Sequence, residues 1–240
     1  MAPDGDVGPE SEFSAMVPTG VGVNASRFHF PSGQDAKAPG QIGMTPVEAV
    51  AAAGPLDNAV RLIARAPVDV IALAFTSTSY VGGDGDDPRL NQRLTQSADG
   101  KPIVTTGQAI LNALRNLGAK RIALIDPPWF PPELTTMGKD WLTRNGMPVV
   151  SAGSAGLPTG QGNIHPGGIY RWIRDNTPVD ADAVVIGGNG FRAVGAVRLL
   201  EKDLQIPVVT ANTALLWEVL RTIGIPTDEV TAYGRMFADD

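Results

Sequence analysis

The sequence predicts an α/β protein made of two related lobes, each with a parallel β-sheet covered by helices. Short apolar runs alternate with amphipathic helical segments along most of the 240 residues, which is the pattern of strand–helix–strand units. The order of these units also repeats, because residues 69–79 and 102–118 correspond to residues 182–190 and 206–224. In each half an apolar strand ends in a polar or glycine-rich turn, and a later strand of the form PIVT or PVVT runs into a helix.

The first half begins with an acidic segment, and a strand is expected within residues 20–30. A glycine- and proline-rich loop follows at residues 31–43. We predict that a helix then begins at Thr45 as the N-cap, because Pro46 occupies the first helical position and Glu48 stands three residues after the cap.

The helical pattern is interrupted at Gly54 and Pro55 and continues to residue 66, and a polar segment at residues 83–100 is assigned no element. Four prolines between residues 126 and 134 exclude regular pairing there, so this segment is an irregular loop. The other expected elements are the strands 68–75, 102–106, 120–126, 147–153, 181–188 and 206–212 and the helices 107–118, 132–146, 166–176, 190–204 and 213–224.

The composition excludes several classes of function. The chain has no cysteine, which rules out disulfides, cysteine-ligated metals and thiol catalysis, and its two histidines lie in no metal-ligand or triad motif. A net charge of −6 with scattered basic residues argues against a nucleic-acid partner. No apolar run approaches the ~18 residues of a membrane helix. The acidic N-terminus is no secretory signal, so we expect a cytoplasmic protein without a membrane partner.

Two turns at the carboxyl ends of predicted strands are candidate ligand sites. The first, residues 76–79, carries four hydroxyl side chains and is followed by Tyr80, whereas the second, residues 187–190, can offer backbone N–H groups to a carboxylate. If the two halves are related, these turns face each other across a cleft, since ligands bind outside the carboxyl ends of such strands. Each turn alone is equally compatible with a structural role. Trp129, in the proline-rich loop, is expected either to cover the pocket or to pack in the core.

A nucleotide cofactor is not expected. Gly188, Gly190 and Ala193 match the GxGxxA pattern, but that pattern requires an acidic residue at the end of the next strand. Residues 210–212 at that point are Thr, Ala and Asn, and no Walker motif occurs in the sequence. No other organic cofactor is indicated.

The chain resembles the Asp/Glu racemase superfamily, in the branch of maleate cis-trans isomerases, arylmalonate decarboxylases and ectoine-utilisation proteins. The resemblance covers nearly the whole chain and is most specific in residues 69–83, 102–125, 187–217 and 233–237. It starts inside the first strand of the family fold, so this strand is expected to be short here, or the native chain to start upstream of Met1.

The resemblance implies two pseudo-symmetric Rossmann-like lobes with the active site in the cleft between them. We expect the first lobe to comprise residues 1–105 and 225–240 and the second to comprise residues 106–224, in a chain that can also be classed as one domain. Members are commonly oligomeric, so a homo-oligomer is one expected state, although the sequence identifies no interface.

The resemblance also implies where the chemistry should lie. Two cysteines, one from each lobe, typically flank the substrate in this superfamily, and the corresponding positions here are Phe75 and Gly188. A thiolate is the group that would transfer the proton or add to a double bond, and neither phenylalanine nor glycine can replace it. Thiol-dependent racemisation and isomerisation are therefore not expected.

The binding residues of the superfamily are better retained. Thr76 and Ser77 match the hydroxyl residues that hold a substrate carboxylate, while Asn189 and Gly190 match the second turn. Asp6 falls where relatives often carry an asparagine that contacts the substrate. A carboxylate there repels a dicarboxylate at close range, but it could accept an amine or serve as an acid or base if its pKa were shifted.

Three hypotheses follow for the function. The first is a cysteine-free, cofactor-independent enzyme acting on a small carboxylic acid, decarboxylase or isomerase-like, with the proton supplied by water, Asp6 or Tyr80. The second is a catalytically silent carboxylate-binding protein on the same scaffold. The third is a lyase or hydrolase acting on an ectoine-like or amide substrate. Because both thiol positions are replaced, the sequence leaves open whether the protein is an enzyme.

Overall fold

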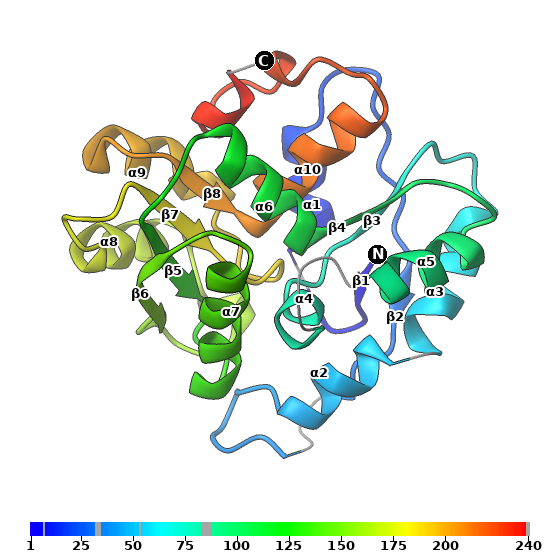
Figure 1. The fold of residues 1–240 in the computed structure, drawn as a ribbon, viewed down its shortest axis with the longest axis horizontal. Helices are drawn as coiled ribbons and strands as arrows, with labels where there is room; N and C mark the ends of the chain where they lie inside the picture. The colour runs from blue at the N-terminus through cyan, green and yellow to red at the C-terminus, as the bar shows by residue number, and fades with distance from the viewer. Residues whose placement is uncertain (7, 32–34, 53, 83–87, 239–240) are drawn as a thin grey trace.

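The computed structural model describes residues 1–6, 8–31, 35–52, 54–82 and 88–238. It is an α/β fold with parallel sheets, as the sequence predicts, and every strand pairing within the described residues is parallel. In Figure 1 the strands β5–β8 lie on the left and the strands β1–β4 on the right. We refer to β1–β4 as the first-lobe strands and to β5–β8 as the second-lobe strands.

The first-lobe strands are short. They are β1 (Ala2–Pro3), β2 (Arg27–Phe28), β3 (Ile71–Leu73) and β4 (Ile103–Thr105). β1 pairs with β2 and β3 pairs with β4, and the N–H of Ala74 donates to the carbonyl of Met1 at 2.8 Å, which connects the two pairs. The four strands therefore follow the order β2-β1-β3-β4.

The second-lobe strands repeat this arrangement. They are β5 (Ile122–Asp126), β6 (Val149–Ser154), β7 (Ala183–Ile186) and β8 (Val208–Thr210), hydrogen-bonded in the order β6-β5-β7-β8. In both lobes the strand that comes second along the chain lies at the edge, followed by the first, third and fourth. This common order agrees with the repeat seen in the sequence, and it makes the turns after β3 and β7 topologically equivalent.

The helices pack around and between these strands. They are α1 (Pro9–Met16), α2 (Met44–Ala51), α3 (Pro55–Ala64), α4 (Ser77–Val81), α5 (Pro88–Ser97), α6 (Thr106–Asn116), α7 (Pro132–Arg144), α8 (Pro166–Asn176), α9 (Val197–Leu204) and α10 (Ala211–Thr222). The strands β4 and β8 end in Thr105 and Thr210, whose side chains accept the N–H of Gln108 and Thr213 and so cap α6 and α10. These two helices contact each other between the lobes (Figure 1).

Several predicted elements differ from the structure. The strand expected within residues 20–30 is reduced to β2. The expected N-cap at Thr45 is wrong, because α2 already begins at Met44 and the Thr45 N–H donates to Asp35 Oδ2 at 3.0 Å. Asp35 thus supplies from ten residues away the acceptor that a local capping side chain would provide. The predicted break at Gly54 is confirmed, with a φ of +121° before α3.

A large hydrophobic core joins the two lobes. It extends from β5 and β7 through α6 and α10 to residues of α1, α2 and α4, and its largest fully buried side chains are Trp141 and Trp217. A smaller core, which includes Leu56 and Leu94, lies under α3 and α5. Because the large core is continuous, it holds the turns after β3 and β7 at a fixed separation.

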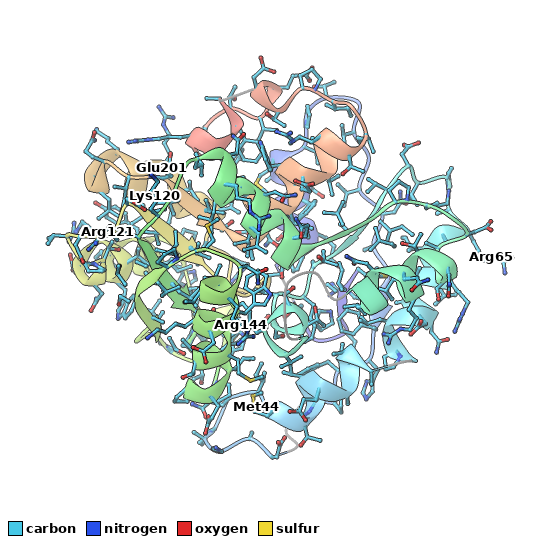
Figure 2. The ribbon with its side chains drawn as sticks, in the orientation of Figure 1. Met44, Arg65, Lys120, Arg121, Arg144 and Glu201 are labelled. Carbon is cyan, nitrogen blue, oxygen red and sulfur yellow. The ribbon has the colours of Figure 1, made fainter. Side chains whose placement is uncertain are left out.

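The segment after α10 contacts both lobes. Glu201 on α9, labelled in Figure 2, accepts the N–H of Val208 at 3.0 Å and that of Arg235 at 3.0 Å. The hydroxyl of Tyr233 donates to the carbonyl of Ala15 in α1 at 3.1 Å. Residues 225–238 of the described chain, expected in the first lobe, therefore lie against α9 of the second lobe as well as against α1.

Candidate active site

A cavity of about 260 Å³ lies between the two lobes. It is lined by the segment after β1, the turn after β3, the loop after β5 and the turn after β7, all of which follow the carboxyl ends of parallel strands. The predicted site residues that line it are Asp6, Phe75, Thr76, Ser77, Trp129, Gly188, Asn189 and Gly190. Tyr80 is the one predicted site residue that does not.

The turn after β3 contains a buried hydroxyl group that has no hydrogen-bond partner among the described residues. This group is the Oγ of Ser77, the first residue of α4, which is fully buried. Thr76 is already engaged, because its N–H and its hydroxyl both donate to Asn189 Oδ1, at 2.9 and 2.8 Å. A buried polar group without a partner costs about 1–3 kcal/mol, so the Ser77 hydroxyl is a candidate contact for a ligand.

The turn after β7 depends on glycine for its close contacts. Gly188 has a φ of +75°, and a Cβ atom there would lie 2.6 Å from Cγ of Pro127. At Gly190 a Cβ atom would lie 2.6 Å from Oδ1 of Asp6, so glycine allows the Asp6 carboxyl group to approach the turn. At Gly188, which the resemblance implies is the second thiol position, the backbone and the neighbours thus both disfavour a side chain.

Asp6 is the acidic group that approaches this second turn. Its Oδ1 accepts a hydrogen bond from Gln161 Nε2 at 2.7 Å. Burial raises the pKa of Asp6, and the hydrogen bond from Gln161 and the charge of Arg27 oppose that rise. Neighbouring Asp4 also lines the cavity but is exposed and accepts a hydrogen bond from His29 at 2.8 Å. A carboxyl group with a raised pKa inside a cavity is suited to proton transfer.

Aromatic side chains form much of the remaining wall. Phe75 packs edge-to-face against Phe28 and Phe30, with ring centroids 5.4 and 5.6 Å apart. Trp129 is buried and packs edge-to-face against Phe191 at 5.8 Å. Phe75, which the resemblance implies is the first thiol position, is therefore part of an aromatic cluster, and this side of the cavity is apolar.

Tyr80 lies in the core rather than at the cavity. Its hydroxyl donates to Asp126 Oδ1 at 3.0 Å, and both side chains are fully buried. Burial raises the pKa of Asp126 to about 7, offset in part by hydrogen bonds from Thr135 and Tyr80. The pKa of Tyr80 is also raised, chiefly by burial. The structure thus separates the two candidate proton donors, since Asp6 lines the cavity and Tyr80 does not.

A buried polar chain behind Asn189 has no counterpart among the predicted site residues. The Nδ2 of Asn189 donates to Asn212 Oδ1 at 2.8 Å, and Asn212 Nδ2 donates to Glu12 Oε2 at 2.7 Å. Glu12 also accepts the N–H of Val194 at 3.0 Å, and burial raises the pKa of Glu12 to about 7. Asn212 is the last residue of the predicted strand 206–212, but nothing in the sequence indicated that it contacts a residue 23 positions earlier.

Within the part of the chain that the structure describes, no group of three or more His, Asp or Glu side chains is arranged to hold a metal ion. None of the helices formed by these residues has the length and apolar character needed to cross a membrane.

Comparisons with known proteins agree with this architecture. A family model described as arylmalonate decarboxylase matches residues 48–237. Maleate isomerase of Geobacillus stearothermophilus is 26% identical over 172 residues, covering 69% of this chain and 68% of that protein. Arylmalonate decarboxylase of Bordetella bronchiseptica is 27% identical over 195 residues, covering 76% of each. The crystal structure of maleate isomerase Iso from Pseudomonas putida S16 superimposes with a TM-score of 0.85 at 21% identity, covering 98% of this chain and 95% of that one.

Proposed function

Because the chain belongs to the arylmalonate decarboxylase family, we propose that it is a cysteine-free enzyme that acts on a small carboxylic acid in the cavity between its lobes. The reaction is a decarboxylation or an isomerase-like proton transfer. The observation that carries this proposal is that the Asp6 carboxyl group and the free Ser77 hydroxyl line one cavity. The first can move a proton, and the second can hold the substrate.

The substrate carboxylate is held between the turn of Thr76 and Ser77 and the turn of Gly188 to Gly190. Ser77 contributes its unpartnered hydroxyl, and the second turn contributes backbone N–H groups. Among the described residues that line the cavity there is no Lys, Arg or His, so hydrogen bonds rather than an ion pair hold the carboxylate. The relatives named maleate isomerase and arylmalonate decarboxylase support a carboxylate ligand of this kind.

Decarboxylation at this site needs no thiol. The bond between the α carbon and the departing carboxylate breaks, CO2 leaves, and the electron pair remains as an enediolate on the retained carboxylate. The apolar wall at Phe75 and Trp129 disfavours the charge of the departing group, while the donors of the two turns stabilise the enediolate. Asp6 then gives its proton to the α carbon and is reprotonated by water. In the isomerase-like reaction, ionised Asp6 would instead remove and return a proton at the α carbon.

Proton NMR in D2O tests this proposal. Maleate, aryl- and alkylmalonates, aspartate and glutamate are incubated with the wild-type protein, Asp6→Asn and Ser77→Ala. Because a general acid or base contributes roughly 100-fold or more to a rate, we expect Asp6→Asn to lose at least that factor in turnover while the ligand still binds. Asp69→Asn, a change at an exposed aspartate outside the cavity, is the matched control. Unchanged turnover by Asp6→Asn would contradict the assignment.

The pH dependence distinguishes the two reactions. Decarboxylation requires the protonated form of Asp6, so its rate should fall as the pH rises through the raised pKa of this carboxyl group. The isomerase-like reaction requires the ionised form, so its rate should rise over the same interval. A profile without any inflection attributable to Asp6 would exclude both roles.

A catalytically silent carboxylate-binding protein is the second candidate. The observation in its favour is that Phe75 and Gly188 leave no nucleophile at either thiol position. In that case the NMR panel would show ligand binding without turnover. The homo-oligomer expected from the resemblance is tested on the same samples by light scattering, where a mass of 25.1 kDa would identify a monomer.

A further inference from the structure

The side chain of Asn189 reaches across from the second lobe to the turn after β3. Its Oδ1 accepts the N–H of Thr76 at 2.9 Å and the hydroxyl of Thr76 at 2.8 Å. The hydroxyl of Thr106 lies 3.3 Å from the same oxygen but also donates to the carbonyl of Leu73 at 2.8 Å. A backbone N–H can only donate, so the atom of Asn189 that faces Thr76 is the amide oxygen. Two donors of the Thr76 turn therefore converge on an oxygen supplied by the protein itself.

The orientation of this amide is fixed from behind by a directional chain of hydrogen bonds. Asn189 Nδ2 donates to Asn212 Oδ1, and Asn212 Nδ2 donates to Glu12 Oε2 at 2.7 Å and to the Asn189 carbonyl at 2.9 Å. Reversing the Asn189 amide would set NH2 against the Thr76 N–H and oxygen against oxygen at Asn212. All four side chains are buried, so such a reversal would leave unpaired groups away from water.

We propose that Asn189 is a specificity-determining residue, whose amide oxygen takes the Thr76 donors and so makes the cavity favour ligands with one carboxylate over ligands with two. One carboxylate of a ligand then binds the Ser77 hydroxyl and the turn of Gly188 to Gly190. A second carboxylate has no further pair of hydrogen-bond donors to bind. When ionised, Asp6, the carboxyl group beside Gly190, also disfavours a second negative charge. This inference rests on the proposed function, because it concerns the same carboxylate site: in the decarboxylation, the retained carboxylate is the one that is held, and the departing carboxylate is the second one, which has no donor pair.

Two ligands that differ by one carboxylate test the inference. They are 3-phenylpropanoate and phenylsuccinate, whose affinities are measured by isothermal titration calorimetry. We expect the wild-type protein to prefer 3-phenylpropanoate. Asn189→Ala frees both Thr76 donors, and a recovered hydrogen bond to a charged group corresponds to about tenfold or more in affinity. The ratio of the two affinities should therefore shift at least about tenfold toward phenylsuccinate.

A double variant ties the shift to Thr76. Thr76→Val keeps the shape of the side chain but removes its hydroxyl, so in the Asn189→Ala background it should reduce the gain for phenylsuccinate. Circular dichroism and thermal unfolding check that each variant is folded. If Asn189→Ala is not folded, Asn189→Ser, whose shorter side chain leaves Thr76 free, replaces it.

The outcomes separate this inference from the proposed function. An unchanged affinity ratio in the folded variants, or a gain that Thr76→Val does not reduce, would overturn the role of Asn189. Turnover by the wild-type protein with an unmoved ratio would reject this inference alone. A shifted ratio without turnover of any compound would support it and reject the enzyme. Absence of binding by wild type and variants would overturn both.

Discussion

Replacing Gly188 by cysteine would return a thiol to the second-lobe position of the superfamily, and we expect this change to destabilise the protein. Gly188 has a φ of +75°, which L-residues other than glycine rarely adopt. Its Cβ would lie 2.6 Å from Cγ and 2.9 Å from Cδ of Pro127, closer than real Cβ atoms approach a neighbouring atom. Both effects act on the same buried turn.

The expected magnitude follows from these two effects. A left-handed backbone conformation costs an L-residue about 1–2 kcal/mol, and overpacking typically costs about 1–3 kcal/mol, so Gly188→Cys should lose about 2–5 kcal/mol of unfolding free energy. For a chain of this length, that loss corresponds to a fall of about 4–20 °C in Tm. Adding Pro127→Ala should recover the overpacking part but not the backbone part.

Guanidinium unfolding followed by circular dichroism measures the loss, and Ellman's reagent counts accessible thiols. The matched control is Gly153→Cys in β6, where a Cβ atom meets open space and φ is not positive. Its stability should stay close to that of the wild type. If Gly188→Cys is as stable as Gly153→Cys, the conclusion that this turn excludes a side chain is wrong.

Two further changes test the buried groups. Asp126→Asn should stabilise the protein increasingly from pH 5 to pH 8: the folded state holds the Asp126 proton up to a pKa of about 7, whereas the unfolded state releases it near 3.8. Wild-type stability therefore falls by up to about 3 kcal/mol over that interval, and Asp126→Asn lacks this fall. Urea unfolding at pH 5 and pH 8 measures this difference in stability, with Asp69→Asn as the control. Parallel pH profiles of stability for the wild type and Asp126→Asn would contradict the prediction. Thr210→Ala removes the N-cap of α10 and should cost about 1 kcal/mol in the same assay. Thr222→Ala, at an exposed position of the same helix, should cost less, and equal losses would contradict the capping role.

The elements that the sequence predicted well are those with a strong local signal. The helices α6 and α10 combine an apolar face with a threonine cap, and β5 and β7 are uninterrupted apolar runs, so local pattern was sufficient. The helix α5 was missed because its segment is polar apart from Leu90 and Leu94, which are four residues apart and buried. Short strands such as β2 form where a neighbouring strand is available, and no local pattern records this.

The candidate site was predictable only in part, for a related reason. The two turns could be found because each follows an apolar strand. Their contacts could not, since Thr76 and Asn189 are separated by 113 positions and Tyr80 and Asp126 by 46. The sequence also could not show that Tyr80 lies in the core, because a tyrosine after a polar turn is compatible with either location. Hydrogen bonds between distant segments depend on how the lobes pack.

The packing around the turn after β7 leaves no room for a side chain at two successive glycines. A Cβ atom at Gly187 would lie 2.0 Å from Oδ1 of Asp126, the atom that accepts the Tyr80 hydrogen bond, and one at Gly188 would meet Pro127. Any side chain at these two glycines therefore requires movement of the segment that follows β5. A single cysteine would therefore not create a thiol site of the kind the resemblance implies without movement of its neighbours. We therefore propose to seek the chemistry of this protein in Asp6 and Ser77, which both line the cavity.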